Sequence, residues 1–405
     1  MRTLIKNVSL VMPDRIIPEG WLVINDSIIE DYGYGNFPKG EFQKTVDGQG
    51  KFLSPGFVDM HIHGAKGMDF FDGTEEAITT VLKTHLQGGI TTMLPSLSSL
   101  PHHRYLAFFE TFNRIKDSLE ARTDIPDIGG IHMEGPFIDG NVIGGMLKSV
   151  CRPINMKEIE TYLEMAPYIK RWTIACEYEG ALALGKELDR RGMMVSIGHS
   201  NATTAQVREA YDYGFRSITH LYSSCSFYHR NGPYREGGIV EAAFLMDNLD
   251  VEIIADGCHL PKDFLQLIYK IKGPDRIALI TDASRYAAID VPQGELLVNE
   301  AEEQPSVYIE NGVAVIEDRT CFAGSISMGN RLVRTMTKVA EVDLPTSVRM
   351  AALTPARMLG MDSQIGSIAR GKRANLIIFD DDINIENIFV GGVEAPVDTD
   401  YRRFR

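Results

Sequence analysis

The alternation of apolar and polar positions changes near residue 52. Before that point, short apolar runs are separated by Pro, Gly and Asp, a pattern typical of strands joined by tight turns. From Phe52 onward, apolar runs of strand length alternate with longer amphipathic segments, and the segments at residues 75–89 and 204–214 predict helices that end near a glycine. This second pattern predicts eight strands, at residues 52–63, 89–97, 127–137, 171–180, 193–200, 217–223, 251–259 and 276–284.

Eight strands with helices between them are typical of a (β/α)₈ TIM barrel rather than a doubly wound sheet. Further β-like sequence follows at residues 306–318 and, after a helical stretch, at residues 366–382. In the latter segment, the pattern of apolar and polar residues is similar to that of the N-terminal region. We therefore expect an α/β protein with two parts. Residues 1–53 and 364–405 pair in a small β-sandwich domain built from both chain ends, and residues 54–363 form the barrel between them.

Composition and charge mainly exclude functions. The formal net charge of −14 argues against non-specific binding to nucleic acid or to anionic membranes. No run approaches the roughly 18 apolar residues of a transmembrane helix, and the N-terminus lacks the apolar core of a signal peptide. The five cysteines are scattered and never form a CxxC pair, which favours reduced thiols. We expect a cytoplasmic protein with neither a nucleic-acid nor a membrane partner.

Side chains that can bind metals fall at the ends of the predicted strands. His61 and His63 lie two residues apart at the end of the first strand, so the strand's period directs both to the same face. Five later strands end near Glu134, His199, His220, His259 and Asp282. In a barrel these ends meet at one mouth, where barrel enzymes place catalysis. Imidazole and carboxylate ligands suit Zn²⁺ or Fe²⁺ better than Mg²⁺ or Ca²⁺.

Each of these residues alone has an ordinary structural explanation. A buried histidine or glutamate is usually a hydrogen-bonded core group, and Asp282 could cap the helix that follows. Six of the eight predicted strands, however, end in such a residue. Their joint occurrence favours a metal site.

Several longer motifs carry a family resemblance: PGFVDMHIHG (55–64), HMEGPF (132–137), GHSNAT (198–203), THLY (219–222), ADGCH (255–259), LITDAS (279–284) and FAGSISM (322–328). With them, the chain resembles the amidohydrolase superfamily and, within it, the N-acetylglucosamine-6-phosphate deacetylase family. ALTPARMLG (352–360) and GSIARGKRANLIIFD (366–380) extend the resemblance over nearly the whole chain. HMEGPF, GHSNAT and ADGCH are specific to the deacetylase branch, whereas the HxH pair is found across the superfamily.

The resemblance implies a metal-dependent hydrolase with one or two divalent ions per chain. One ion would be held by Glu134, His199 and His220. The HxH pair, His61 and His63, implies a second ion with Glu134 as the bridging carboxylate, although some family members lack this pair and use a single metal. Zinc and iron are not distinguished by ligands this similar.

The resemblance also implies the reaction. Asp282 would join the metal ligands and transfer protons between the attacking water and the leaving amine, while His259 would polarise the scissile carbonyl. The expected substrate is an N-acetylated amino sugar phosphate, N-acetylglucosamine 6-phosphate above all, giving glucosamine 6-phosphate and acetate in amino sugar metabolism. The family further implies a homodimer, and places Ala323, Gly324 and Ser325 beside the substrate.

Substrate recognition departs from the family pattern. Relatives carry Gly-Ala-His after HMEGPF, where this chain has Gly144-Gly145-Met146. The phosphate-holding Asn-Ala pair after THLY is replaced by Ser223-Ser224, and Arg-Glu-Pro-Gly becomes Arg235-Glu236-Gly237-Gly238 after a short insertion. Ser223, Ser224, Arg230 and Arg235, with His229, are therefore the expected phosphate contacts. A solvated loop is the alternative interpretation of this stretch.

Three other functions stay open at this point. The enzyme could act on another N-acylated sugar, such as N-acetylgalactosamine 6-phosphate, or on a small amide. A cyclic amide hydrolase or aminohydrolase of the same superfamily is a second alternative, but these more often use a carboxylated lysine, and no strand-end lysine stands where Glu134 does. A non-catalytic barrel scaffold is the remote third, because scaffolds typically lose their metal ligands.

Overall fold

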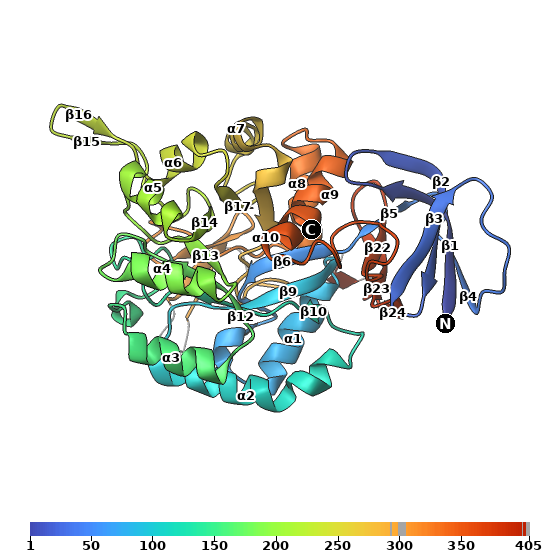
Figure 1. Cartoon of the computed structure of the whole chain (residues 1–405), viewed down its shortest axis with the longest axis horizontal. Coiled ribbons are helices and arrows are strands. Elements are labelled where there is room, and N and C mark those ends of the chain that lie inside the picture. Colours follow the sequence, from blue (N-terminus) through green and yellow to red (C-terminus); the bar gives the residue numbers. More distant parts are fainter. Residues whose placement is uncertain (292–293, 299–304, 399, 402–405) are drawn as a thin grey trace.

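A computed structural model describes residues 1–291, 294–298, 305–398 and 400–401. Its centre is a barrel of eight parallel strands in chain order, each hydrogen-bonded to the next (Figure 1). Between the last strand and the first, the backbone N–H of Asp282 donates to the carbonyl of His61 over 2.9 Å. The predicted barrel is thereby confirmed. Its strands are β6 (Phe57–Ile62), β9 (Ile90–Leu97), β11 (Ile131–Glu134), β12 (Ile169–Ile174), β13 (Met194–Ile197), β14 (Phe215–Ile218), β17 (Asp250–Ile254) and β18 (Ile277–Ile280).

A helix follows every barrel strand. The predicted helices at residues 75–89 and 204–214 are present as α1 and α5, and each begins at a threonine whose hydroxyl accepts a backbone N–H of the first turn. The eight helices of the barrel are α1 (Glu75–Leu86), α2 (His102–Glu120), α3 (Met156–Met165), α4 (Ala181–Arg190), α5 (Thr204–Asp212), α6 (Ile239–Leu245), α7 (Lys262–Lys272) and α8 (Gly329–Lys338). Two shorter helices, α9 (Leu344–Ala351) and α10 (Leu353–Met358), follow α8.

The two chain ends share one eight-stranded sheet beside the barrel, as predicted (Figure 1). Its strands are β1 (Arg2–Val11), β2 (Ile16–Asn25), β3 (Ile28–Tyr34), β4 (Lys44–Asp47), β5 (Phe52–Pro55), β22 (Leu376–Phe379), β23 (Ile385–Val390) and β24 (Val393–Ala395). β22 pairs with β5, so the C-terminal strands continue the N-terminal ones. Apolar residues from both ends pack in one buried cluster on this sheet, including Leu10, Leu53 and Phe389.

The first predicted strand, residues 52–63, is divided between the two sheets. β5 belongs to the small sheet and β6 to the barrel, with Gly56 between them. A Cβ atom at Gly56 would collide with the side chain of Thr91, so only glycine fits where the chain crosses over. The division into residues 1–53 with 364–405 and residues 54–363 stays a prediction.

Several predicted strands also extend too far at their C-terminal ends. β12 ends at Ile174 and β14 at Ile218, where sequence patterning continued them to residues 180 and 223. The residues that follow still include buried apolar side chains such as Ala175 and Leu221, but their backbone has left the barrel. These post-strand segments carry the candidate site.

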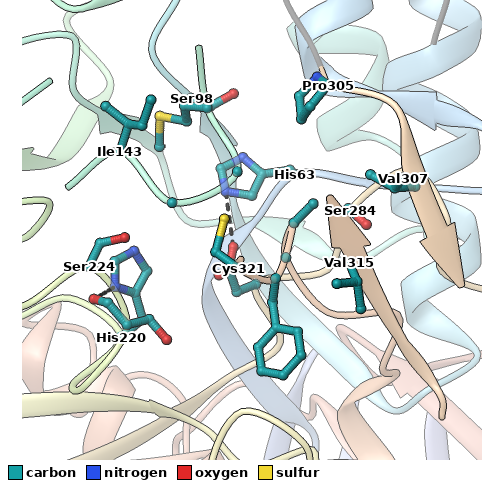
Figure 2. A pocket seen from close by; sticks show the side chains of 18 of the residues that line it. His63, Ser98, Ile143, His220, Ser224, Ser284, Pro305, Val307, Val315 and Cys321 are labelled. Atoms are coloured by element: carbon teal, nitrogen blue, oxygen red, sulfur yellow. Dashed lines mark hydrogen bonds and ion pairs between the residues drawn. The ribbon is translucent and has the colours of Figure 1, made fainter. Parts of the chain in front are cut away.

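Insertions at the barrel mouth add short β elements. The segment between β18 and α8 contains β19 (Leu296–Leu297), β20 (Val307–Glu310) and β21 (Val313–Ile316), and Figure 2 shows Val307 and Val315 beside the pocket. The insertion after THLY forms a hairpin, β15 (His229–Asn231) and β16 (Tyr234–Glu236), which projects away from the barrel in Figure 1. The remaining short elements are β7 (Gly64–Ala65), β8 (Met68–Asp69), β10 (Asp127–Ile128) and 3₁₀ turns at Phe70–Asp72, Lys148–Val150 and Pro274–Arg276.

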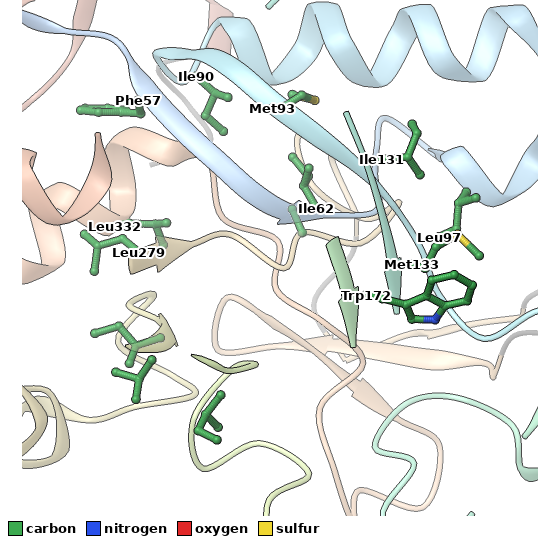
Figure 3. Close-up of a cluster of buried hydrophobic side chains, with 14 of the residues drawn as sticks. Phe57, Ile62, Ile90, Met93, Leu97, Ile131, Met133, Trp172, Leu279 and Leu332 are labelled. Carbon is green, nitrogen blue, oxygen red and sulfur yellow. The ribbon is translucent and has the colours of Figure 1, made fainter. Parts of the chain in front are cut away.

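The main apolar core lies on the outside of the barrel strands, under the helices. Figure 3 shows Ile62, Met133 and Trp172 from three strands in this core, with Leu332 of α8 at its edge. No helix in the described part of the chain is both long enough and apolar enough to cross a bilayer.

Candidate active site

The predicted metal ligands do converge at the C-terminal ends of the barrel strands. His61 lies within β6 with His63 just after it, and Glu134 is the last residue of β11. Three more ligands, His199, His220 and Asp282, lie two residues beyond the ends of their strands. Their φ angles are left-handed, at 49°, 31° and 46° in the same order. Such backbone angles are uncommon for residues other than glycine and cluster at functional sites. Here they accompany side chains that face the barrel mouth.

Glu134 stands at the centre of the cluster. Its Oε1 lies 3.0 Å from Nε2 of His199 and 3.0 Å from Nε2 of His220. The same oxygen is 3.2 Å from Nε2 of His61, whereas Oε2 is 3.2 Å from Nε2 of His63. One carboxylate thus faces all four imidazoles, with its two oxygens divided between them.

Asp282 completes a second group with the HxH pair. Its Oδ1 lies 3.2 Å from Nε2 of His63 and 3.6 Å from Nε2 of His61. Two sets of donor atoms are therefore close enough to share an ion: His61, Glu134 and His220, and His61, His63 and Asp282. His61 belongs to both.

The orientation of the imidazoles fits metal binding. Every Nδ1 atom faces an oxygen that can only accept a hydrogen bond, so each Nδ1 carries a proton and Nε2 is directed into the cluster. His199 and His220 bring their Nε2 atoms to 3.0 Å of each other, where two lone pairs would repel without a cation between them. The Nδ1 partners are Ser96 O at 3.1 Å for His63, Val142 O at 3.1 Å for His199, Ser223 O at 3.0 Å for His220 and Glu252 Oε2 at 3.3 Å for His61.

Burial and neighbouring charge act against each other on the pKa values of these groups. Burial lowers the pKa of His61, but the carboxylates of Glu134 and Asp282 raise it to about 9. Burial raises the pKa of Glu134, yet the surrounding histidines, His61 foremost, hold it well below its usual range. Burial likewise raises the pKa of Asp282, and His61 and His63 lower it overall. Both carboxylates are therefore ionised at neutral pH, and a divalent cation would replace the imidazole proton.

His259 stands on the wall of the pocket, held by an aspartate that sequence analysis did not select. Nδ1 of His259 lies 2.8 Å from Oδ2 of Asp256, and the backbone N–H of His259 donates to Oδ1 of the same residue over 2.8 Å. The His259 ring also packs on Phe322, with ring centroids 4.7 Å apart. Asp256 belongs to the ADGCH motif, and its spacing of three residues from His259 was the signal that could have found it.

A cavity of about 460 Å³ opens above these groups, a volume suited to a small-molecule ligand. Its lining includes His63, Glu134, His199, His220, His259 and Asp282, together with four of the predicted substrate residues, Ser223, Ser224, Ala323 and Gly324. Figure 2 shows Ser224 beside His220 on one side and Val307 and Val315 on the other.

Three predicted substrate residues lie outside the cavity lining of their own chain. Arg230 and Arg235 face each other across the β15–β16 hairpin, on exposed strands outside the cavity lining. The insertion forms a hairpin of its own, which carries both arginines away from the mouth of their own chain (Figure 1). Ser325 lies beneath the pocket, where its hydroxyl donates to the carbonyl of Thr281 over 2.6 Å and its N–H donates to the carbonyl of Asp282 over 2.8 Å.

The Gly144-Gly145-Met146 segment lies against the site, as its position in the sequence predicted. A Cβ atom at Gly144 would come within 2.8 Å of the Ser224 hydroxyl oxygen, and one at Gly145 within 2.8 Å of the Ala323 Cα. These glycines let the loop approach closely enough for the carbonyl of Val142 to accept from His199.

Comparison with known proteins assigns the family. The profile of the amidohydrolase family matches residues 52–399, which include the barrel and the C-terminal strands. The chain belongs to the amidohydrolase family. This amidohydrolase is 31% identical to the N-acetylglucosamine-6-phosphate deacetylase of Lysinibacillus sphaericus, over 86% of each chain. It is 29% identical to the N-acetylgalactosamine-6-phosphate deacetylase of Escherichia coli O157:H7, over 84% of this chain and 87% of that one.

Solved structures agree with this assignment. The N-acetylglucosamine-6-phosphate deacetylase of Pasteurella multocida superposes with a TM-score of 0.87 at 26% identity, over 97% of this chain and 99% of that one. A variant of the Mycobacterium smegmatis enzyme in complex with N-acetyl-D-glucosamine-6-phosphate gives a TM-score of 0.85 at 26% identity, over 97% of this chain and 98% of that one. The protein is a metal-dependent amidohydrolase, which removes the scaffold alternative.

Sequence analysis missed the arginines that do line the pocket of this amidohydrolase, Arg285 and Arg319. Arg285 donates to Oδ1 of Asp72 over 2.7 Å, and Arg319 is held by Glu310 over 2.8 Å. Arg285 follows LITDAS directly, so its distance from Asp282 was a usable signal. Nothing in the sequence marked Arg319, because the β-like run before it does not show that this hairpin folds over the barrel mouth.

Proposed function

We propose that this amidohydrolase removes the N-acetyl group from an amino sugar 6-phosphate, N-acetylglucosamine 6-phosphate in the first place, to give glucosamine 6-phosphate and acetate. The observation that carries the proposal is the convergence of four imidazoles and two carboxylates on the floor of one cavity, with His259 on its wall. The deacetylases to which the chain is similar support the choice of substrate.

The same cluster would hold one or two divalent ions, Zn²⁺ or Fe²⁺. Glu134, His199 and His220, whose facing donor atoms lie 3.0 Å apart, would hold one ion, and His61, His63 and Asp282 would hold the other. A bound divalent ion supplies Lewis acidity, which allows water to lose a proton near pH 7.

Asp282 and His259 then have separate roles in the reaction. The ionised Asp282 carboxylate accepts a proton from the attacking water and returns it to the nitrogen of the leaving amine. His259, whose Nδ1 is held 2.8 Å from Oδ2 of Asp256, would polarise the acetamide carbonyl from the wall of the cavity. Groups that polarise a carbonyl in this way typically lower the activation barrier by about 3–4 kcal/mol.

The phosphate-binding motifs of the family are changed in this chain, so the phosphate donors are proposed from the cavity itself. Ser223 and Ser224 offer hydroxyls, and Arg285 and Arg319 offer the guanidinium groups that suit phosphate oxygens. Met146, in the position of a sugar-contacting histidine in relatives, offers an apolar contact instead.

A second candidate substrate is N-acetylgalactosamine 6-phosphate. Two relatives with that activity in their names, from Escherichia coli and Shewanella, are 29% and 28% identical to this chain. These values lie close to the 31% of the glucosamine-type relative. The two sugars differ only in the configuration at one hydroxyl, so pocket contacts rather than the metal centre would separate them.

The test is a screen of N-acetylglucosamine, N-acetylgalactosamine and their 6-phosphates, scored by release of primary amine. We expect the fastest release from N-acetylglucosamine 6-phosphate. Faster release from the galactosamine analogue would select the second candidate. Preference for an unphosphorylated sugar would contradict the phosphate assignment, and release from none of the four would contradict the proposed function.

We also propose a cytoplasmic homodimer, which rests on the family resemblance and the cysteine pattern alone. Light scattering on the eluate of a size-exclusion column gives the mass directly. A monomeric mass at micromolar concentration would contradict the dimer.

A further inference from the structure

A buried ion pair lies inside the barrel, directly beneath the candidate metal centre. Arg171 of β12 and Glu252 of β17 are both fully buried, and Nη1 of Arg171 contacts Oε1 of Glu252. The guanidinium also donates to the carbonyl of Met60 over 3.0 Å, to Thr219 Oγ1 over 2.9 Å and to Ser196 Oγ over 3.2 Å. Charges are buried at a high cost in free energy unless they are paired, and apolar side chains often replace such a pair without loss of stability.

The other carboxylate oxygen of Glu252 faces the metal centre. Oε2 lies 3.3 Å from Nδ1 of His61, and the backbone N–H of His220 donates to the same oxygen over 3.4 Å. Glu252 therefore touches two candidate ligands without being near enough to the cluster to be a ligand of either set.

His61 is set apart from the other three histidines by this contact. His63, His199 and His220 each direct Nδ1 to a backbone carbonyl, whereas the acceptor for His61 is a carboxylate. A charged acceptor fixes the tautomer more strongly and makes the opposite nitrogen a better donor to a metal. His61 also lies close enough to share an ion with either of two donor groups, Glu134 with His220 or His63 with Asp282.

We propose that Glu252, held in place by Arg171, is a positioning residue that fixes His61 with Nε2 toward the metal ion. Arg171 keeps the carboxylate charged and oriented, so the ion pair acts on the ion through His61. The inference rests on the proposed metal centre.

The experiment compares the affinity of purified protein for Zn²⁺ in wild type, Glu252→Gln and the double variant Arg171→Met with Glu252→Met. Each protein is stripped with a chelator and titrated with Zn²⁺ against a chelating dye, and circular dichroism reports folding. We expect both variants to bind at least one Zn²⁺ about 10- to 100-fold more weakly than wild type. The double variant removes both charges together, so it keeps the test valid where Glu252→Gln fails to fold.

Glu158→Gln is the matched control. Glu158 also pairs with an arginine, Arg152, but its described partners include no candidate ligand. We expect its Zn²⁺ affinity to equal that of wild type. A folded Glu252 variant with wild-type affinity would overturn the positioning role, as would an equal loss in the control. Wild-type protein that takes up no Zn²⁺ or Fe²⁺ would instead contradict the proposed function.

Discussion

The floor and the rim of the cavity differ in what holds their side chains. On the floor, Glu134 and the four histidines are buried, stand at or near strand ends, and have defined partners for their outer nitrogen atoms. On the rim, the side chains come from loops and are more exposed, with Arg319 at 51% and Phe322 at 38%. Each rim arginine pairs with an acid on another loop or strand end, Arg285 with Asp72 and Arg319 with Glu310.

This difference separates chemistry from recognition. The floor is fixed by hydrogen bonds that span several barrel strands, so small changes there disturb the geometry that reaction requires. Contacts on the rim can change with loop length and sequence without moving the ligands. We therefore expect the residues of the floor to determine the type of reaction, and those of the rim to determine which sugar is accepted.

Loss of Glu134 is expected to have the largest effect. Its carboxylate lies beside all four imidazoles, so Glu134→Ala removes the shared ligand and leaves their nitrogens without a common partner. Amine release should fall to the background rate, by about a thousandfold or more, and bound metal should be lost. Circular dichroism should stay close to wild type, because the group serves the mouth and not the apolar core. Global unfolding of the variant would contradict this division between floor and core.

Asp282→Asn should have the next largest effect. We expect kcat to fall by about 10²- to 10⁴-fold, the range for a general acid–base group. The amide keeps the shape of the side chain but cannot accept the proton. Ser284→Ala, two residues further along the chain, is the control and should change kcat little. An Asp282→Asn variant that retains most of its kcat would assign the proton transfers to another residue.

The pH dependence of metal binding tests the electrostatics of the floor. Without metal, burial lowers the pKa of His61, but Glu134 and Asp282 raise it to about 9, so the imidazole is protonated at neutral pH. A metal ion must displace that proton, whereas the carboxylates are already ionised. Burial also lowers the pKa of His63, but Asp282 and Glu134 raise it well above its usual range, so a second proton must leave. Apparent Zn²⁺ affinity should therefore rise with pH, by at least about tenfold per unit up to about pH 9. Calorimetric titration at pH 6.5, 7.5 and 8.5 measures this slope, and a flat profile would contradict it.

Substitutions on the rim should have the smallest effects, and these effects should be mainly on KM. Arg319→Ala should raise KM for the phosphorylated sugar about 10-fold, because a hydrogen bond to a charged group contributes about 1.5–3 kcal/mol. It should leave kcat and the unphosphorylated analogue nearly unchanged. Arg235→Ala is the comparison variant, since Arg235 lies outside the cavity of its own chain. A larger effect at Arg235 would mean that the hairpin reaches the cavity of a second copy.

The same contrast explains what could be read from the sequence. His61, His63, Glu134, His199 and Asp282 were predictable because strand period and strand order place them at one barrel mouth. That inference needs no knowledge of loop paths. The short apolar runs at both chain ends likewise predicted their shared sheet.

Other parts of the site depend on contacts between distant segments. Glu252 is a single acid in an apolar strand, and its importance depends on Arg171 and His61 from other strands. Arg319 follows β21, whose position beside the cavity depends on contacts with distant segments, and Arg235 lies outside the cavity lining because the insertion folds back on itself as a hairpin. Spacing along the chain predicts none of these contacts.

The most direct test of the central claim is metal reconstitution with the proposed substrate. The purified protein is stripped with a chelator and titrated with Zn²⁺ or, without oxygen, with Fe²⁺, while amine release from N-acetylglucosamine 6-phosphate is followed. We expect no activity in the stripped protein, and activity that rises with added metal and saturates at one or two ions per chain. Full activity in protein shown by elemental analysis to hold no metal would contradict the account.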